Sequence, residues 1–116
     1  MEPCESFDIT IYQGADYSDS FLLQNASSVA IDLTDSVITS ELRRGPAGEN
    51  YPVIASFVIS TPTPTTGQID RALSGVITAS LPLGQKLFYD VKIVLSNGSI
   101  IYPIRGSVAI EPSITL

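Results

Sequence analysis

Hydrophobic and polar residues alternate along most of this 116-residue chain, and the clearest case is the closing stretch 89–110. Asn97-Gly98 lies between its two alternating runs, and this dipeptide is a strong hairpin signal because both turn residues must accept positive φ. A two-residue loop would place the apolar partners on one face and an opposite-charge pair on the other. The predicted pairs are Ser96–Ser99, Leu95–Ile100, Ile93–Tyr102, Val91–Ile104 and Asp90–Arg105.

Several earlier stretches also alternate and end at glycine, proline or asparagine, as strands do. In the stretch 99–110, Gly106 indicates a bulge or bend. Residues 61–67 form a proline-rich connection that cannot be a central strand. The further predicted strands are residues 7–12, 17–24, 29–33, 37–43 and 68–73.

Residues 51–60 are apolar on both faces, which fits either a buried central strand or a surface that meets a neighbouring subunit. Under the second interpretation, this stretch, the adjacent loop 43–50 and the Thr-Pro repeat 61–66 would contact a partner. The candidate interface residues are Tyr51, Val53, Phe57, Ile59, Arg43, Arg44, Thr63 and Pro64.

One short helix is expected near residues 75–81. Ser74 can cap it, and Leu73, Ile77 and Leu81 fall on one helical face. The alternative is a strand, because Val76 and Thr78 also alternate.

Short strands separated by turns every 8–12 residues are typical of an all-β sandwich. We expect an Ig-like antiparallel β-sandwich of about seven strands, with a small barrel as the alternative. The length suits a single domain. We assign it to residues 6–116, after a flexible N-terminal stretch 1–5.

Composition narrows the range of partners. The charged share is 16% and the net charge is −6. This balance opposes binding to nucleic acid or to an anionic membrane surface, which both need basic residues. Cys4 is the only cysteine, so no intrachain disulfide forms, and its acidic neighbours make it an unreactive thiol. The sequence shows no signal peptide or membrane span, so we expect a soluble protein made in a reducing compartment.

Candidate chemistry is sparse. The chain has no histidine, which removes the commonest general base and most zinc sites. Two aspartate pairs, Asp16/Asp19 and Asp32/Asp35, could serve a hydrolase or a metal site, but turn and surface roles fit their positions better. Arg43 and Arg44 suit surface pairing with Glu41 or Glu49. We therefore expect no enzymatic activity, no cofactor and no metal.

Short motifs follow one another along almost the whole chain, and in this order they resemble the small Ig-like β-sandwich virion proteins of tailed bacteriophages, of the type found in tail and baseplate gene clusters. The chain departs from the family at Asp35-Ser36, where Gly-Tyr is usual, and at the loop Gly45-Pro-Ala-Gly48. The matching motifs are Ile11-Tyr-Gln-Gly-Ala-Asp-Tyr17 with Phe21, Ile31-Asp-Leu-Thr34, Gly67-Gln-Ile with Leu73-Ser74, Leu81-Pro-Leu-Gly84, Tyr89-Asp-Val-Lys-Ile93 and Arg105-Gly-Ser-Val-Ala-Ile-Glu-Pro-Ser-Ile-Thr115.

The resemblance implies a structural virion component, made in the host cytoplasm, that assembles in several copies at the tail or baseplate or attaches fibres. Its expected partners are other virion proteins and copies of itself. The alternatives are a capsid decoration (cement) protein, present in many more copies, and a carbohydrate-binding adhesive module, which would need an exposed aromatic platform.

Overall fold

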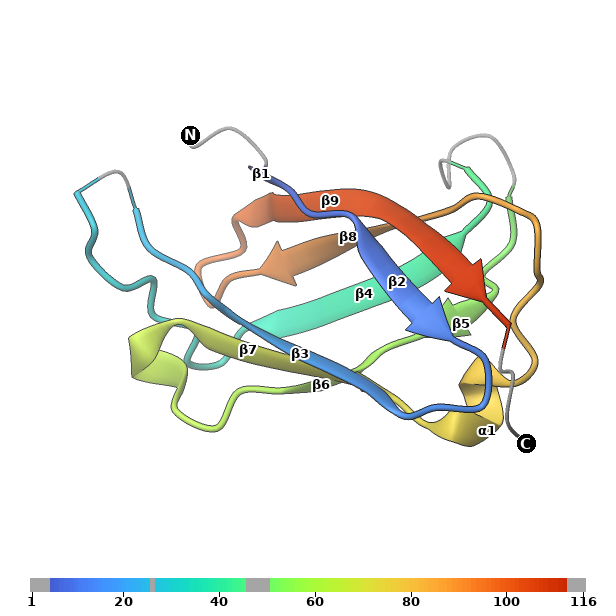
Figure 1. The fold of residues 1–116 in the computed structure, drawn as a ribbon. Coiled ribbons are helices and arrows are strands. Elements are labelled where there is room, and N and C mark those ends of the chain that lie inside the picture. Colours follow the sequence, from blue (N-terminus) through green and yellow to red (C-terminus); the bar gives the residue numbers. More distant parts are fainter. Residues whose placement is uncertain (1–4, 26, 46–50, 113–116) are drawn as a thin grey trace.

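The computed structural model describes residues 5–25, 27–45 and 51–112, which form two β-sheets packed face to face (Figure 1). The large sheet has the order β1-β9-β8-β4-β5, and β2 also pairs with β9. The small sheet has the order β3-β7-β6. The strands are β1 (Glu5–Ser6), β2 (Ile9–Tyr12), β3 (Tyr17–Leu22), β4 (Val37–Arg43), β5 (Ala55–Ser56), β6 (Val58–Ser60), β7 (Gln68–Leu73), β8 (Leu87–Val94) and β9 (Ile100–Glu111).

The core lies between the sheets because strands of both sheets turn alternate residues inward. In β8 every second side chain is buried, starting at Leu87, and in β4 Ser40 and Leu42 face the same interior. Each fully buried aliphatic side chain stabilises the fold by about 1.5–3 kcal/mol. The predicted all-β sandwich is confirmed.

The first two strands pair in parallel with the last one, which differs from the purely antiparallel sheets we expected. Glu5 lies opposite Ile104, and the register continues from Ile9 opposite Val108 to Tyr12 opposite Glu111. The predicted strand 7–12 is observed as β2 over Ile9–Tyr12, and β1 precedes it as a separate short strand. The flexible stretch predicted at the N-terminus, with Cys4, falls mostly on residues 1–4, which lie outside the described residues.

The closing hairpin is confirmed, but its turn is one residue longer than predicted. The Leu95 N–H donates to the Ser99 carbonyl at 2.8 Å, so Ser96-Asn97-Gly98 forms a three-residue loop. Gly98 has φ +88°, the left-handed conformation that such loops need at their last position.

A bulge in β9, beyond the turn, returns the strand pairing to the predicted register. Ile93 pairs with Ile101 instead of Tyr102, whereas Val91 still pairs with Ile104 and Asp90 with Arg105. The extra residue of β9 lies in the Tyr102-Pro103 segment, where proline has no N–H to donate. The bulge predicted at Gly106 is thus wrong, since Gly106 pairs regularly with Tyr89.

Residues 51–60 cross from the large sheet to the small one without a change in alternation: Ala55, Phe57 and Ile59 turn toward the interior, and Val58 stays exposed. Ala55–Ser56 pairs with β4 in the large sheet, and Val58–Ser60 pairs with β7 in the small sheet. Phe57 lies between them, donates its N–H to the Ser40 carbonyl and buries its ring.

Two connections contain little or no regular strand, and one of them was predicted to be a strand. In the predicted strand 29–33, the backbone forms a single bridge, between Ala30 and Gln24, because Ser28 takes a left-handed turn conformation. Residues 61–67 are a connection, as predicted, and contain a 3₁₀ turn over Pro64–Thr66.

The predicted short helix is confirmed as α1 (Gly75–Thr78), whose N-cap is Ser74. The Asp16 Oδ1 atom accepts a hydrogen bond from the Gly75 N–H at 2.7 Å, and the buried Thr78 hydroxyl donates to the Ala15 carbonyl at 2.8 Å. These bonds hold the helix against the loop between β2 and β3.

We predict that Gly106→Ala strongly destabilises the fold. A methyl group there would lie 1.8 Å from the Phe7 carbonyl oxygen, so the backbone entering β2 would have to move. We expect a loss of about 3 kcal/mol in the free energy of unfolding, measured with urea.

Gly98→Ala is the control, because its methyl group meets open space, although its φ of +88° adds a backbone strain that Gly106 does not have. It should cost about 1 kcal/mol. Equal costs for the two variants would contradict the close approach at Gly106.

Candidate functional site

A buried arginine lies at the centre of the sandwich. In β7, Arg71 takes the inward position between Ile69 and Leu73 and is 1% exposed. Asp19 lies directly opposite in β3, and its carboxylate accepts two hydrogen bonds from the guanidinium, at 2.9 and 2.6 Å. Such bidentate pairing is the strongest geometry for an arginine and a carboxylate.

Three aromatic rings and a serine complete the surroundings of Arg71. Its guanidinium carbon lies 4.9, 4.2 and 4.4 Å from the ring centroids of Phe21, Phe57 and Tyr89. It also donates to Ser40 Oγ at 3.0 Å, and Ser40 donates in turn to the Asp90 carbonyl at 2.7 Å. Because the guanidinium is enclosed by these groups, this cluster stabilises the fold and leaves no face for a ligand.

Two tyrosines at the edge of this cluster hold their protons tightly. The Tyr17 hydroxyl donates to Asp19 at 2.6 Å, and burial together with this carboxylate raises the pKa of Tyr17 well above its ordinary value. Burial also raises the pKa of Tyr89, whose hydroxyl donates to the Phe7 carbonyl at 2.6 Å. Both groups act as hydrogen-bond donors within the fold.

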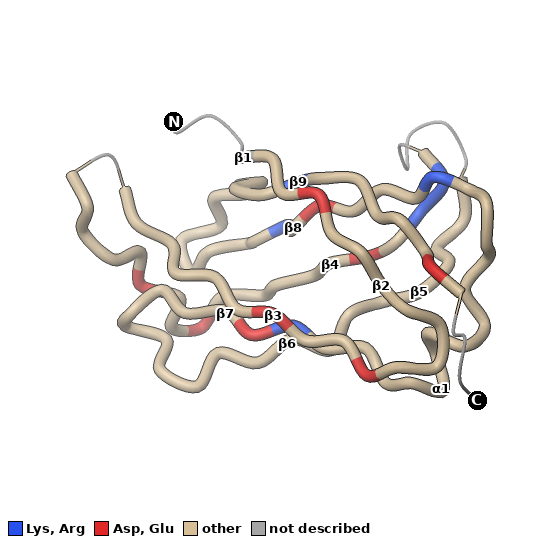
Figure 2. The backbone as a smooth tube through the Cα atoms, viewed as in Figure 1, with Lys and Arg blue, Asp and Glu red and all other residues tan. Residues whose placement is uncertain are grey.

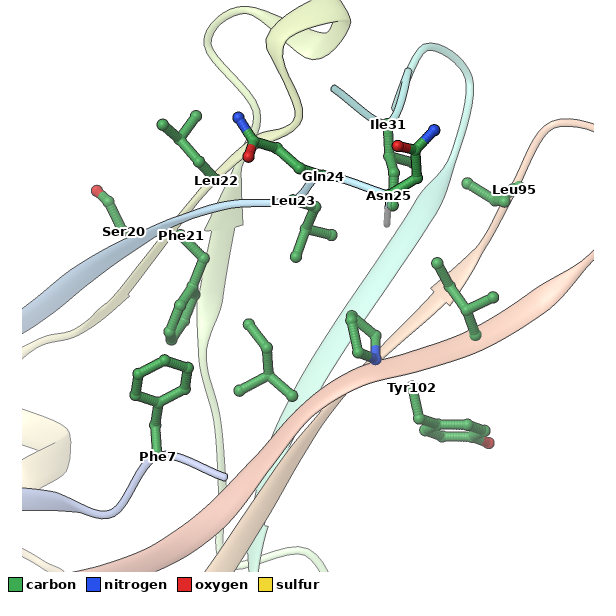
Figure 3. A pocket seen from close by; sticks show the side chains of 13 residues that line it. Phe7, Ser20, Phe21, Leu22, Leu23, Gln24, Asn25, Ile31, Leu95 and Tyr102 are labelled. Carbon is green, nitrogen blue, oxygen red and sulfur yellow. The ribbon is translucent and has the colours of Figure 1, made fainter. Parts of the chain in front are cut away.

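The second feature is an apolar groove between β3 and the beginning of β9, with a volume of about 810 Å³ (Figure 3). Phe7 and Phe21 meet at one side of it, with their ring centroids 5.8 Å apart. Phe7, Leu22 and Tyr102 are exposed, at 44%, 64% and 48%. The residues that line this β3–β9 groove are Phe7, Ser20, Phe21, Leu22, Leu23, Gln24, Asn25, Ile31, Leu95, Ile101, Tyr102, Pro103 and Ile104.

One wall of the groove is a free strand edge. Among the described residues, β3 pairs on one side alone, with β7. The Leu23 N–H donates to the Gly67 carbonyl, so odd-numbered residues of β3 direct their backbone groups toward β7. Since these directions alternate in an antiparallel pair, Ser18, Ser20 and Leu22 present their N–H and C=O groups to the open side.

The groove lining itself carries no charge, but carboxylates surround it. Asp8 follows Phe7, Asp32 follows Ile31, and Asp70 accepts a hydrogen bond from the lining residue Ser20 at 2.7 Å. Figure 2 shows acidic positions along β3 and β7 and before β2, with basic positions beside them in β7 and β9. Arg105, next to Ile104, lies opposite Asp90 in the hairpin.

The aspartates considered as catalytic or metal candidates have structural partners. Asp16 binds the first N–H of α1, and Asp19 pairs with Arg71. Asp32 accepts hydrogen bonds from the hydroxyl and N–H of Thr34, which lower the pKa of its carboxyl group. Asp35 occupies a turn with φ +58°. The turn and surface interpretation therefore fits Asp16, Asp32 and Asp35, whereas Asp19 lies inside the sandwich.

The candidate interface residues of 51–60 do not form one surface. Phe57 is buried beside Arg71, and Ile59 is half-buried against the core. Tyr51 and Val53 are exposed. The buried interpretation therefore describes Phe57 and Ile59, because the chain turns inward at the crossing.

The other candidates lie at two opposite ends of the sandwich (Figure 1). Arg43 pairs with Glu41 at 3.0 Å and donates to the Tyr51 carbonyl, and Arg44 donates to Gln85. Thr63 and Pro64 belong to the 3₁₀ connection at the other end, and Thr63 is exposed. Most of the loop 43–50 lies outside the described residues.

Sequence reasoning missed both the Arg71 cluster and the β3–β9 groove. The alternation of β7 was a usable signal for Arg71, because it places a charge on the same face as Ile69 and Leu73. The groove had no comparable signal, since its walls come from three segments that are distant in the sequence.

In the described part of the chain, no three His, Cys, Asp or Glu residues are grouped so that they could hold a metal ion. The same residues contain no helix that is long and apolar enough to span a membrane. In comparisons with known proteins, no family model and no curated protein matches this sequence.

We predict that Asp19→Ala costs about 3 kcal/mol in the free energy of unfolding, because it leaves the Arg71 charge buried without its partner. Asp70→Ala in the facing strand is the control and should cost clearly less, since Asp70 is half-buried and accepts hydrogen bonds only from the neutral groups of Ser20 and Gln68. The double variant Asp19→Leu/Arg71→Met should recover most of the loss. Urea unfolding measures all three, and equal effects of Asp19→Ala and Asp70→Ala would refute the role of the pair.

We also predict a loss of stability at alkaline pH that depends on Tyr17. Its raised pKa means that the folded chain keeps the proton above pH 10.0, where the unfolded chain releases it, so stability falls as pH rises. Tyr17→Phe should lower stability near neutral pH by about 1 kcal/mol but reduce the decline between about pH 9 and pH 11. Urea midpoints of the unsubstituted chain and of Tyr17→Phe across this pH range test the prediction, and an equally steep decline in both would contradict the role of Tyr17.

Proposed function

We propose that this chain is a structural, non-enzymatic component of a tailed bacteriophage virion, which assembles in several copies at the tail or baseplate or attaches fibres. In this proposal its partners are other virion proteins and copies of itself, and contacts between proteins perform the function.

The observation that carries the proposal is the β3–β9 groove. Exposed apolar surface bordered by polar residues is typical of surfaces that bind proteins. Here Phe7, Leu22 and Tyr102 are partly exposed around a hollow of about 810 Å³, beside a strand edge with free backbone groups. A free edge of this kind is a template for pairing with another chain.

Two further observations support a scaffold role. The polar cluster around Arg71 is enclosed, and its hydrogen bonds join the two sheets. The order of motifs along the chain, from the Gln-Gly-Ala-Asp run at residues 13–16 to the closing strand, is similar to that of the phage proteins named above.

We predict that the chain copurifies with tailed particles at a constant ratio to the major tail protein. Quantitative mass spectrometry of gradient-purified particles measures this ratio, and particles stripped of tails are the control. A ratio that follows the heads would move the protein to the capsid. Recovery in the soluble fraction alone would refute a virion role.

A further inference from the structure

We infer that the β3–β9 groove binds an extended, uncharged apolar segment of a different protein, which adds to the free edge of β3 as a fourth strand of the small sheet and carries basic residues at its ends. This inference rests on the proposed function and names the chemistry of the partner.

The backbone of β3 favours an added strand over other shapes of ligand. Ser18, Ser20 and Leu22 each offer an N–H and a C=O group in a regular row, which only another extended backbone can satisfy completely. The facing stretch Ile100–Pro103 of β9 is a poorer template, because Pro103 has no N–H and the bulge interrupts its edge.

The lining of the groove determines the side chains of the segment. Phe7, Phe21, Ile31 and Ile101 line the groove beside the β3 edge, and none of the thirteen lining residues is charged. A strand turns every second side chain to the same face, so alternate large apolar residues would enter the groove while the residues between them face solvent. A charged residue in an inward position would lose its hydration without gaining a partner.

The carboxylates near the groove determine which charge the two ends of the bound segment should carry. Asp8, Asp32 and Asp70 remain ionised, because hydrogen bonds from Ser107, Thr34 and Ser20, respectively, hold the pKa of each below its ordinary value. Lysine or arginine at the ends of the segment would complement this acidic rim.

The same charges disfavour a second copy of this chain as the occupant. Each copy has a net charge of −6 and carries the same acidic rim. Two copies joined at this edge would therefore bring like charges together, which reduces affinity.

A peptide titration tests the inference. The probe is a fluorescent peptide of about ten residues, the length of a long strand, in which valine alternates with threonine between lysines at both ends. We expect saturable binding by fluorescence anisotropy that weakens as salt increases. A peptide with glutamates at its ends, and one with N-methyl groups on alternate amides, should each bind at least about ten-fold more weakly, a difference of about 1.4 kcal/mol.

Two matched protein variants locate the binding. Leu22→Glu places a charge on the outer face of the small sheet beside the free β3 edge, where the added strand would lie, and Val58→Glu places one at the opposite edge of the same sheet, where Val58 is as exposed as Leu22 (66% and 64%). Both should fold like the unsubstituted chain. We expect Leu22→Glu to weaken binding by at least about ten-fold and Val58→Glu to change it by less than about two-fold.

Several results would overturn the inference. They are absence of saturable binding, equal binding of the N-methylated peptide, equal binding of the glutamate-flanked peptide, and equal effects of the two variants. If the chain self-associates and Leu22→Glu abolishes this, a second copy of the chain is the occupant of the groove. If the peptide binds only after residues 1–4 are removed, those residues are the occupant. Failure of peptide binding in a chain that still copurifies with particles refutes this inference alone, whereas absence from particles refutes the proposed function.

Discussion

The ion pair between Arg71 and Asp19 is the interaction on which the rest of the sandwich depends. Its hydrogen bonds continue through Ser40 to the Asp90 carbonyl, so they connect β3 and β7 of the small sheet to β4 and β8 of the large one. Apolar packing alone would allow the two sheets to slide, whereas a buried charge has one position in which all its donors are satisfied. We therefore regard this pair as what fixes the sheets relative to each other.

The local features of the fold could be predicted from the sequence, because their causes are local. Alternation identified β4, β7 and the closing hairpin, and Ser74 identified the start of α1. The hairpin also shows the limit. Asn97-Gly98 indicated a two-residue loop, and the register near the turn was wrong by one residue until the bulge near Pro103 restored it. Pro103 was a usable signal for that bulge, but the sequence analysis predicted the bulge at Gly106.

Features that depend on distant segments could not be predicted in this way. The parallel pairing of β1 and β2 with β9 joins residues about one hundred positions apart, and no periodicity within either segment specifies its partner. The crossing at Phe57 left no mark in the sequence, because the same alternation of side chains continues from β5 into β6. The groove exists only where β3, β9 and the loop 23–31 meet. Its residues were absent from the predicted interface for that reason.

The parallel arrangement of β1 and β2 on β9 has a consequence during synthesis. β1 and β2 find their sheet partner only after β9, about one hundred residues later, has left the ribosome. A prematurely terminated product would leave β8 without its main neighbour and the interior of the large sheet open to proteases. Only chains translated through β9 would display the complete groove, because the start of this strand forms one of its walls.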